Sequence, residues 1–130
     1  TIDILYNNSY EVEDKIIVGT RGWDYSKTAD KKIIEREINR LVISLESAKK
    51  SENNKEIIAC MHYPPISKNL INNEYEQKII NILKEYNVKK CLYGHLHGTA
   101  HKDAINGERE NIKFSLVSAD YLDFKLLKIN

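Results

Sequence analysis

The sequence has few cysteines, prolines and glycines, almost no net charge and no long apolar run. Its 130 residues include only 2 cysteines, 2 prolines and 5 glycines, and its formal net charge is +1. A charge so close to zero gives no general electrostatic reason to bind nucleic acid or an acidic membrane. No apolar run approaches the roughly 20 residues that span a bilayer, and the first residues lack the basic and apolar regions of a signal peptide. We therefore expect a cytoplasmic globular protein.

The two cysteines carry little chemical signal. Cys60 and Cys91 each lie within an apolar stretch, and neither belongs to a CxxC spacing. We favour free thiols in the core of a protein from a reducing compartment. A disulfide is the alternative, because two neighbouring strands could hold these residues side by side.

Apolar periodicity predicts one α/β domain over residues 1–130. Short apolar runs indicate strands at residues 2–6, 15–20, 57–61 and 88–93. The third run is apolar throughout, which is typical of an interior strand covered on both faces. Stripes that repeat at steps of three and four predict helices at 30–50 and 73–86. Asn73, with Glu76 three residues later, resembles a helix capping box.

The last third of the chain is expected to be antiparallel β-structure. Asn106-Gly107 is a hairpin signal, because both residues tolerate the positive φ of a tight turn. The flanking strands would cover 99–105 and 112–117, and a last strand would cover 124–129. The order of elements then indicates a layered α/β fold.

Histidines follow two of the predicted strands. His62 comes directly after one, and His95 and His97 come after another, between Gly94 and Gly98. Sites in open α/β sheets form at the carboxyl ends of strands, and neutral imidazole is a common metal ligand. Alone, His62 would more simply be a hydrogen-bonded structural residue. Together the two blocks favour metal ligation by His62, His95 and His97.

These blocks resemble the motifs of a known family. Gly94-His95-Leu96-His97 is similar to the GHxH signature of calcineurin-like metallophosphoesterases, and residues 61–65 (MHYPP) look like their preceding histidine block. Residues 19–23 (GTRGW) resemble a strand-and-loop segment of bacterial members. The resemblance implies a sandwich of two β-sheets flanked by helices, of which this chain would be the C-terminal half.

The family's upstream motifs, DxH, GDxxD and GNHD or GNHE, do not occur in this sequence. The resemblance implies two divalent metal ions (Mn, Fe or Zn), with His62 and His95 on one and His97 on the other, completed by the missing motifs. It implies a phosphate-ester substrate. A fragment of this kind should be inactive alone, and it should self-associate or pair with its N-terminal half.

Three further residues are candidates for a substrate rim. Arg21 could pair with a phosphate, although a solvated side chain is the simpler interpretation. Trp23 could line the cleft or pack beneath its own loop. Tyr63 could close over a substrate or serve packing alone. His101 is expected on the surface of the hairpin, with a role in supporting a ligand or contacting substrate as the alternative. Asp103 and Asp120 could hydrogen-bond a ligating imidazole, but turn or surface roles are expected for both.

The sequence thus predicts a metal-dependent phosphatase or phosphodiesterase. A non-catalytic metal-binding or interaction module that uses the same histidines is the alternative. A fragment that holds no metal at all is a third possibility.

Overall fold

The strands form one mixed sheet. The computed structural model describes residues 2–25, 30–50, 54–70 and 73–129. The six strands of the sheet lie in the order β1-β2-β3-β4-β6-β5. Their bounds are β1 Ser9–Val12, β2 Lys15–Thr20, β3 Glu56–Met61, β4 Lys90–Tyr93, β5 Gly107–Arg109 and β6 Ile112–Leu116. Strands β2, β3, β4 and β6 are parallel, and β1 and β5 add antiparallel edges. The α/β class and the interior position of residues 57–61 are confirmed.

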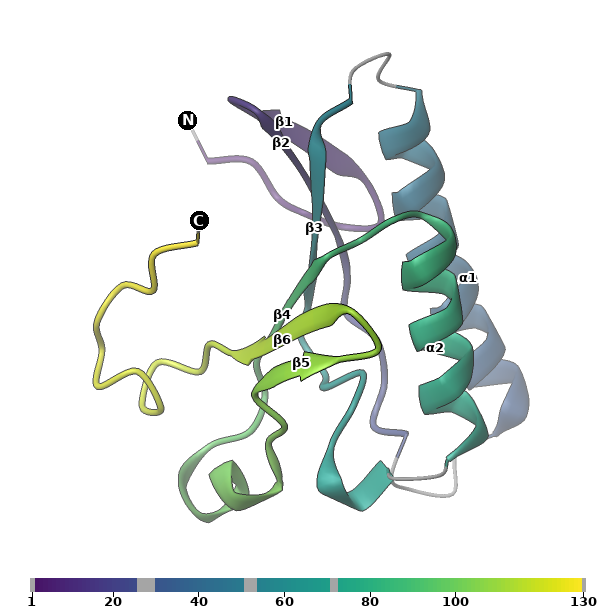
Figure 1. Cartoon of the computed structure of the whole chain (residues 1–130). Coiled ribbons are helices and arrows are strands. Elements are labelled where there is room, and N and C mark those ends of the chain that lie inside the picture. The colour runs from purple at the N-terminus through teal and green to yellow at the C-terminus, as the bar shows by residue number, and fades with distance from the viewer. Residues whose placement is uncertain (1, 26–29, 51–53, 71–72, 130) are drawn as a thin grey trace.

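Both long helices cover the same face of this sheet. Helices α1 (Lys31–Lys49) and α2 (Glu74–Glu85) lie side by side against it, and the two terminal segments run along the other side (Figure 1). Residues paired across parallel strands point to the same face. The buried side chains of the helix-covered face include Ile16, Val18, Ala59, Met61, Cys91, Tyr93, Phe114 and Leu116. They pack against the apolar stripes of the helices, which contribute Ile34, Ile38, Leu41, Leu45, Ile79 and Leu83.

The start of α2 confirms half of the predicted capping box. Asn73 Oδ1 accepts a hydrogen bond from the backbone N–H of Tyr75 at 2.8 Å. Glu76 is instead buried, and it pairs with Arg109 Nη1 at 2.6 Å. This ion pair ties α2 to β5, because a carboxylate out of water needs a charged partner.

The first predicted strand is misplaced. Residues 2–6 form no strand, and β1 begins at Ser9 instead. Leu5 lies against β2 at Gly19, where an added Cβ would come within 2.5 Å of Leu5 Cδ2 and 2.4 Å of the Cys60 carbonyl oxygen. The apolar character of this segment therefore reflects packing across the sheet, and Gly19 is needed for the close approach.

The hairpin in the last third is also displaced. Its turn lies at Glu110 and Asn111, whose φ values are 49° and 65°, and not at Asn106-Gly107. Residues 99–105 belong mostly to a 3-10 helix (Gly98–Asp103), and residues 124–129 form no strand. Strand β6 runs parallel to β4, so the region is not wholly antiparallel. Asn106 instead binds the end of β6, its Oδ1 accepting from the backbone N–H of Leu116 at 2.8 Å.

The two cysteines are free, as predicted. Cys60 is in register with Leu92, and Cys91 with Ala59, so the thiols lie on neighbouring strands but point to opposite faces. Burial raises the pKa of the Cys60 thiol to about 11. In the part of the chain that the structure describes, no helix has the length and apolarity to cross a membrane.

The cap of α2 gives a test of the fold. We expect Asn73→Ala to lower the free energy of unfolding by about 1 kcal/mol, because it removes an N-cap acceptor. Urea denaturation followed by circular dichroism measures this. Asn81→Ala, at an exposed position inside the same helix, is the control and should lose no stability, because alanine has the higher helix propensity. Equal losses in both variants would contradict the capping role.

Candidate metal and substrate site

Register places the candidate site at one edge of the sheet. Thr20, Met61 and Tyr93 lie side by side at the ends of β2, β3 and β4. The residues that follow are therefore neighbours, and backbone bonds hold them together. The Tyr63 N–H donates to the Arg21 carbonyl at 2.9 Å, and the Gly94 N–H donates to the His62 carbonyl at 3.2 Å.

His62 and His95 meet at this edge. The distance from His62 Nε2 to His95 Nδ1 is 3.2 Å. His95 has a φ of 71°, a conformation uncommon outside glycine, which follows the carboxyl end of β4. Two imidazole nitrogens bound to one tetrahedral metal at about 2.0–2.1 Å each lie about 3.3 Å apart. The spacing of this pair therefore fits two ligands of one ion.

His97 contacts a different partner. Its Nδ1 lies 2.8 Å from Asp120 Oδ1, a contact in which an Nδ1–H group would donate to the carboxylate. Metal-binding histidines commonly hold such a bond to a carboxylate. Among the described residues, no group of three or more His, Cys, Asp or Glu side chains converges as a metal site. The structure thus brings His62 and His95 together and gives His97 its own carboxylate.

Asp120 contacts an imidazole, which the sequence offered as one possibility for this residue while a turn or surface role was expected. Its carboxylate accepts from the Gly98 N–H at 2.9 Å and the Tyr121 N–H at 3.0 Å, besides contacting His97. The Gly98 bond, followed by the two imidazoles of His97 and His101, holds the pKa of Asp120 well below its usual range. Its position shortly after β6, at the same edge as the histidine loops, was the available signal.

The expected hairpin position of His101 is also wrong. The residue lies in the 3-10 helix after β4, with Nε2 3.2 Å from Asp120 Oδ2. Its ring packs edge-on against Tyr121, with centroids 5.2 Å apart. His101 therefore belongs to the Asp120 cluster. No contact singles out Asp103 in the same way.

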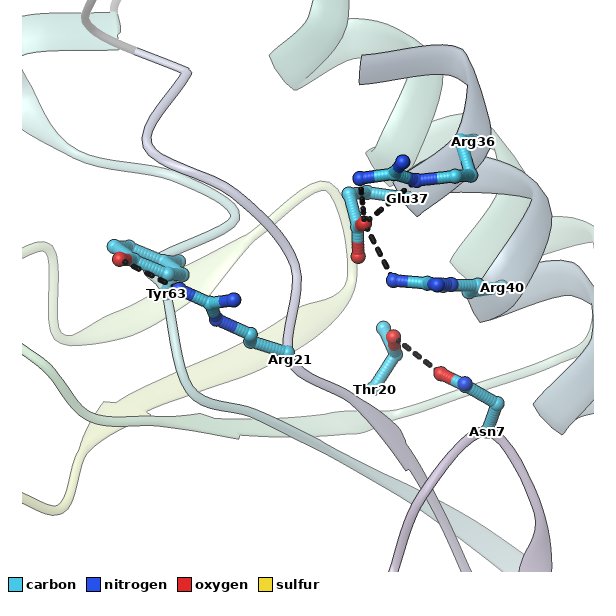
Figure 2. Close-up of polar contacts among 7 residues, drawn as sticks. All are labelled: Asn7, Thr20, Arg21, Arg36, Glu37, Arg40 and Tyr63. Atoms are coloured by element: carbon cyan, nitrogen blue, oxygen red, sulfur yellow. Dashed lines mark hydrogen bonds and ion pairs between the residues drawn. The ribbon is translucent and has the colours of Figure 1, made fainter. Parts of the chain in front are cut away.

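The three predicted rim residues lie together. The Arg21 guanidinium carbon is 5.3 Å from the centroid of the Trp23 ring and 5.5 Å from that of Tyr63. Figure 2 shows Arg21 extending toward Tyr63, where Nη2 and Oη are 3.5 Å apart. The Tyr63 centroid is in turn 4.2 Å from that of His95. Tyr63 thus packs and also borders the histidines, and Arg21 is both exposed and stacked on aromatic rings.

A buried ion pair lies behind this rim on α1. Glu37 is 1% exposed, and its Oε1 lies 2.7 Å from Arg40 Nη1 and 3.3 Å from Arg36 Nη2 (Figure 2). Glu37 sits three residues after Ile34, on the apolar stripe, so its burial could have been inferred from spacing.

The surroundings of His62 lower its pKa below the ordinary histidine value of 6.5. Partial burial is the main cause, followed by His95, Arg21 and His97. A histidine with a lowered pKa is neutral over a wider pH range, and neutrality is what metal ligation requires.

This shift gives a pH prediction. We expect the His62 ring, followed by NMR, to titrate below pH 6.5 in the folded chain and near 6.5 in urea. The folded state then binds fewer protons than the unfolded state between the folded pKa of His62 and about 6.5. The free energy of unfolding therefore rises with pH across this range, and His62 lowers it most below the folded pKa. A folded pKa above the urea value would contradict the described surroundings.

Comparisons of this chain with models of known protein families, with curated proteins and with solved structures find no match. The function must therefore be argued from the motifs and from the arrangement of the residues just described.

Proposed function

We propose that this chain is the C-terminal half of a metal-dependent phosphoester hydrolase with a dinuclear metal centre. The observation that carries the proposal is the 3.2 Å separation of the His62 and His95 nitrogens at the carboxyl edge of the sheet. Beside them, on the loop of the GHxH motif, His97 is held by a carboxylate. The resemblance to metallophosphoesterases rests on these same residues.

The donor set fits borderline divalent metals. Imidazole nitrogens suit Zn and Fe, and Mn becomes suitable when carboxylates join the shell. His62 and His95 would hold one ion. His97 would hold the second through Nε2, because its Nδ1 is bonded to Asp120. The chemistry that such a centre supplies is a hydroxide nucleophile near neutral pH and neutralisation of phosphate oxygens.

Other residues of this chain have supporting roles in the proposal. Asp120 keeps His97 in the tautomer that exposes Nε2. Arg21 stands at the rim, where its planar, permanently charged guanidinium suits a phosphate oxygen. Stacking on two aromatic rings reduces the freedom of Arg21 before a substrate arrives.

The remaining ligands would come from upstream motifs of a longer polypeptide. Aspartate and asparagine residues of the DxH, GDxxD and GNH type would complete both shells, as the resemblance implies. A non-catalytic metal-binding module is the alternative, and an upstream sequence without these motifs would favour it. The free thiols are compatible with our proposal of a cytoplasmic location.

Metal dependence tests the proposed function. We expect the longer polypeptide to hydrolyse an aryl phosphate or phosphodiester only with divalent metal, and the 130-residue chain alone to be inactive in the same assay. His95→Ala or His97→Ala should abolish turnover without unfolding, since each removes a ligand from a loop that the sheet builds. Activity loss of at least about 100-fold is the expected size.

Lys102→Ala, an exposed change on the same segment, is the matched control and should retain activity. Full activity after thorough chelation, or unchanged turnover in both histidine variants, would refute the mechanism.

We also propose that the sheet face opposite the helices pairs with the missing N-terminal half. Ile17, Cys60 and Leu92 point to this face and are only partly buried. Large apolar side chains of both terminal segments are exposed nearby, including Ile2 at 93% and Phe124 at 84%. Such a surface is a liability in water and favours a covering partner. A two-sheet sandwich would supply that cover.

Self-association tests this second proposal. Without its partner, the chain is expected to form dimers or larger species in light scattering and to bind an apolar dye. Leu126→Glu, at a fully exposed position, should weaken association without unfolding the chain. Ile43→Glu on α1 is the control, because it exchanges an exposed apolar residue on the other side of the molecule. A monomer at high concentration that binds no dye would overturn the proposal.

A further inference from the structure

A small pocket opens beside His95, away from the Asp120 cluster. Its volume is about 190 Å³, and its lining includes the aromatic and apolar side chains of Trp23, Tyr63 and Leu96. Carboxylates and an amide also line it. The proposed metal chemistry uses none of these pocket walls, apart from His95 itself.

The size of the pocket limits its occupant. Sites for drug-sized ligands occupy roughly 300–1,000 Å³, so about 190 Å³ suits one planar ring system and not a peptide or a whole dinucleotide. Tryptophan and tyrosine rings favour such a flat partner, because offset stacking adds to the gain from burial. The shape and lining therefore favour a heteroaromatic or aryl ring.

The charge of the pocket restricts the occupant further. Asp24 and Asp103 line it, whereas the guanidinium of Arg21 lies outside it, stacked on Trp23 and Tyr63. An ionised carboxylate only accepts hydrogen bonds. A second phosphate would be repelled from the pocket, and a ring that carries N–H donors would be favoured.

We propose that this pocket binds a planar ring with N–H donors, such as a purine base, as the organic group of the phosphoester. The ring would lie between the aromatic side chains and Asp103, and the phosphate would face His95 and Arg21. This orientation rests on the proposed function, but binding of the ring alone does not.

Trp23 provides a direct test, because it is the only tryptophan of the chain. Metal-free chain is titrated with adenosine while tryptophan fluorescence is recorded. We expect a saturable change that ribose does not produce and that N6,N6-dimethyladenosine, which lacks the exocyclic N–H donors, produces only at higher concentration. Asp103→Asn should weaken adenosine binding about tenfold, the size of a lost charge-assisted hydrogen bond.

Glu108→Gln is the matched control, an exposed carboxylate-to-amide change outside the pocket, and should leave binding unchanged. NMR shifts of the Leu96 and Ala100 amides give a second measurement that does not depend on fluorescence. Absence of both signals, or equal affinity in the chain and in Asp103→Asn, would overturn the pocket assignment. If this chain binds adenosine but the longer polypeptide hydrolyses no phosphoester, the pocket assignment stands and the proposed hydrolase function is refuted.

Discussion

The in-phase parallel register of β2, β3 and β4 is the constraint on which the site depends. It aligns Thr20, Met61 and Tyr93 in one row, so that Arg21, His62 and the loop of His95 leave the sheet at the same level. A slip of one residue would turn every side chain of a strand to the opposite face. The buried residues of the helix-covered face oppose such a slip, because it would turn Val18 or Ala59 away from the helices and bring Gly19 or Cys60 toward them. Core packing therefore fixes the spacing of the histidines without any help from a metal.

The same edge of the sheet separates two electrostatic environments. On one side, Asp120 is surrounded by N–H donors and imidazoles, which keep it ionised and orient His97. On the other, partial burial is the main cause that lowers the pKa of His62, followed by the nearby His95 and Arg21. This shift favours the neutral His62 ring, the form that metal ligation needs. The histidines would be neutral metal ligands, and few carboxylates lie beside them to offset the charge of two divalent ions. Under the proposed function, carboxylates from another part of the protein would complete the site.

The sequence predicted those strands and helices that have a clear apolar periodicity and pack against elements nearby in the chain. Residues 15–20 and 57–61, and the two long helices, were predicted within a few residues because periodicity and capping agree there. It failed where an apolar segment has no strand partner, as at residues 2–6 and 124–129, and where Asn106 binds β6 instead of turning. Arg21, Trp23 and Tyr63 were named as candidates from motifs, and their proximity follows from register. The sequence could not select Asp120 and His101 over their simpler surface roles, because their contacts depend on how the loop after β6 packs against the one after β4. No spacing in the sequence encodes that contact.

The packing of the sheet and the proposed metal chemistry would both be completed by a partner on the same face. The helix-covered face is closed by two apolar stripes, but the opposite face leaves Ile17 and Leu92 partly open, beside exposed terminal side chains. The site has paired imidazoles and, within the described residues, no converging set of three metal ligands. A second sheet on the open face would end at the same edge, where its loops could supply carboxylates to His62, His95 and His97. One partner would thus remove both the exposed apolar surface and the shortage of negative charge. A homodimer would cover the surface, but a second copy would not bring the DxH, GDxxD and GNH motifs, which this sequence does not contain. For this reason we favour the N-terminal half over a second copy as the natural occupant of that face.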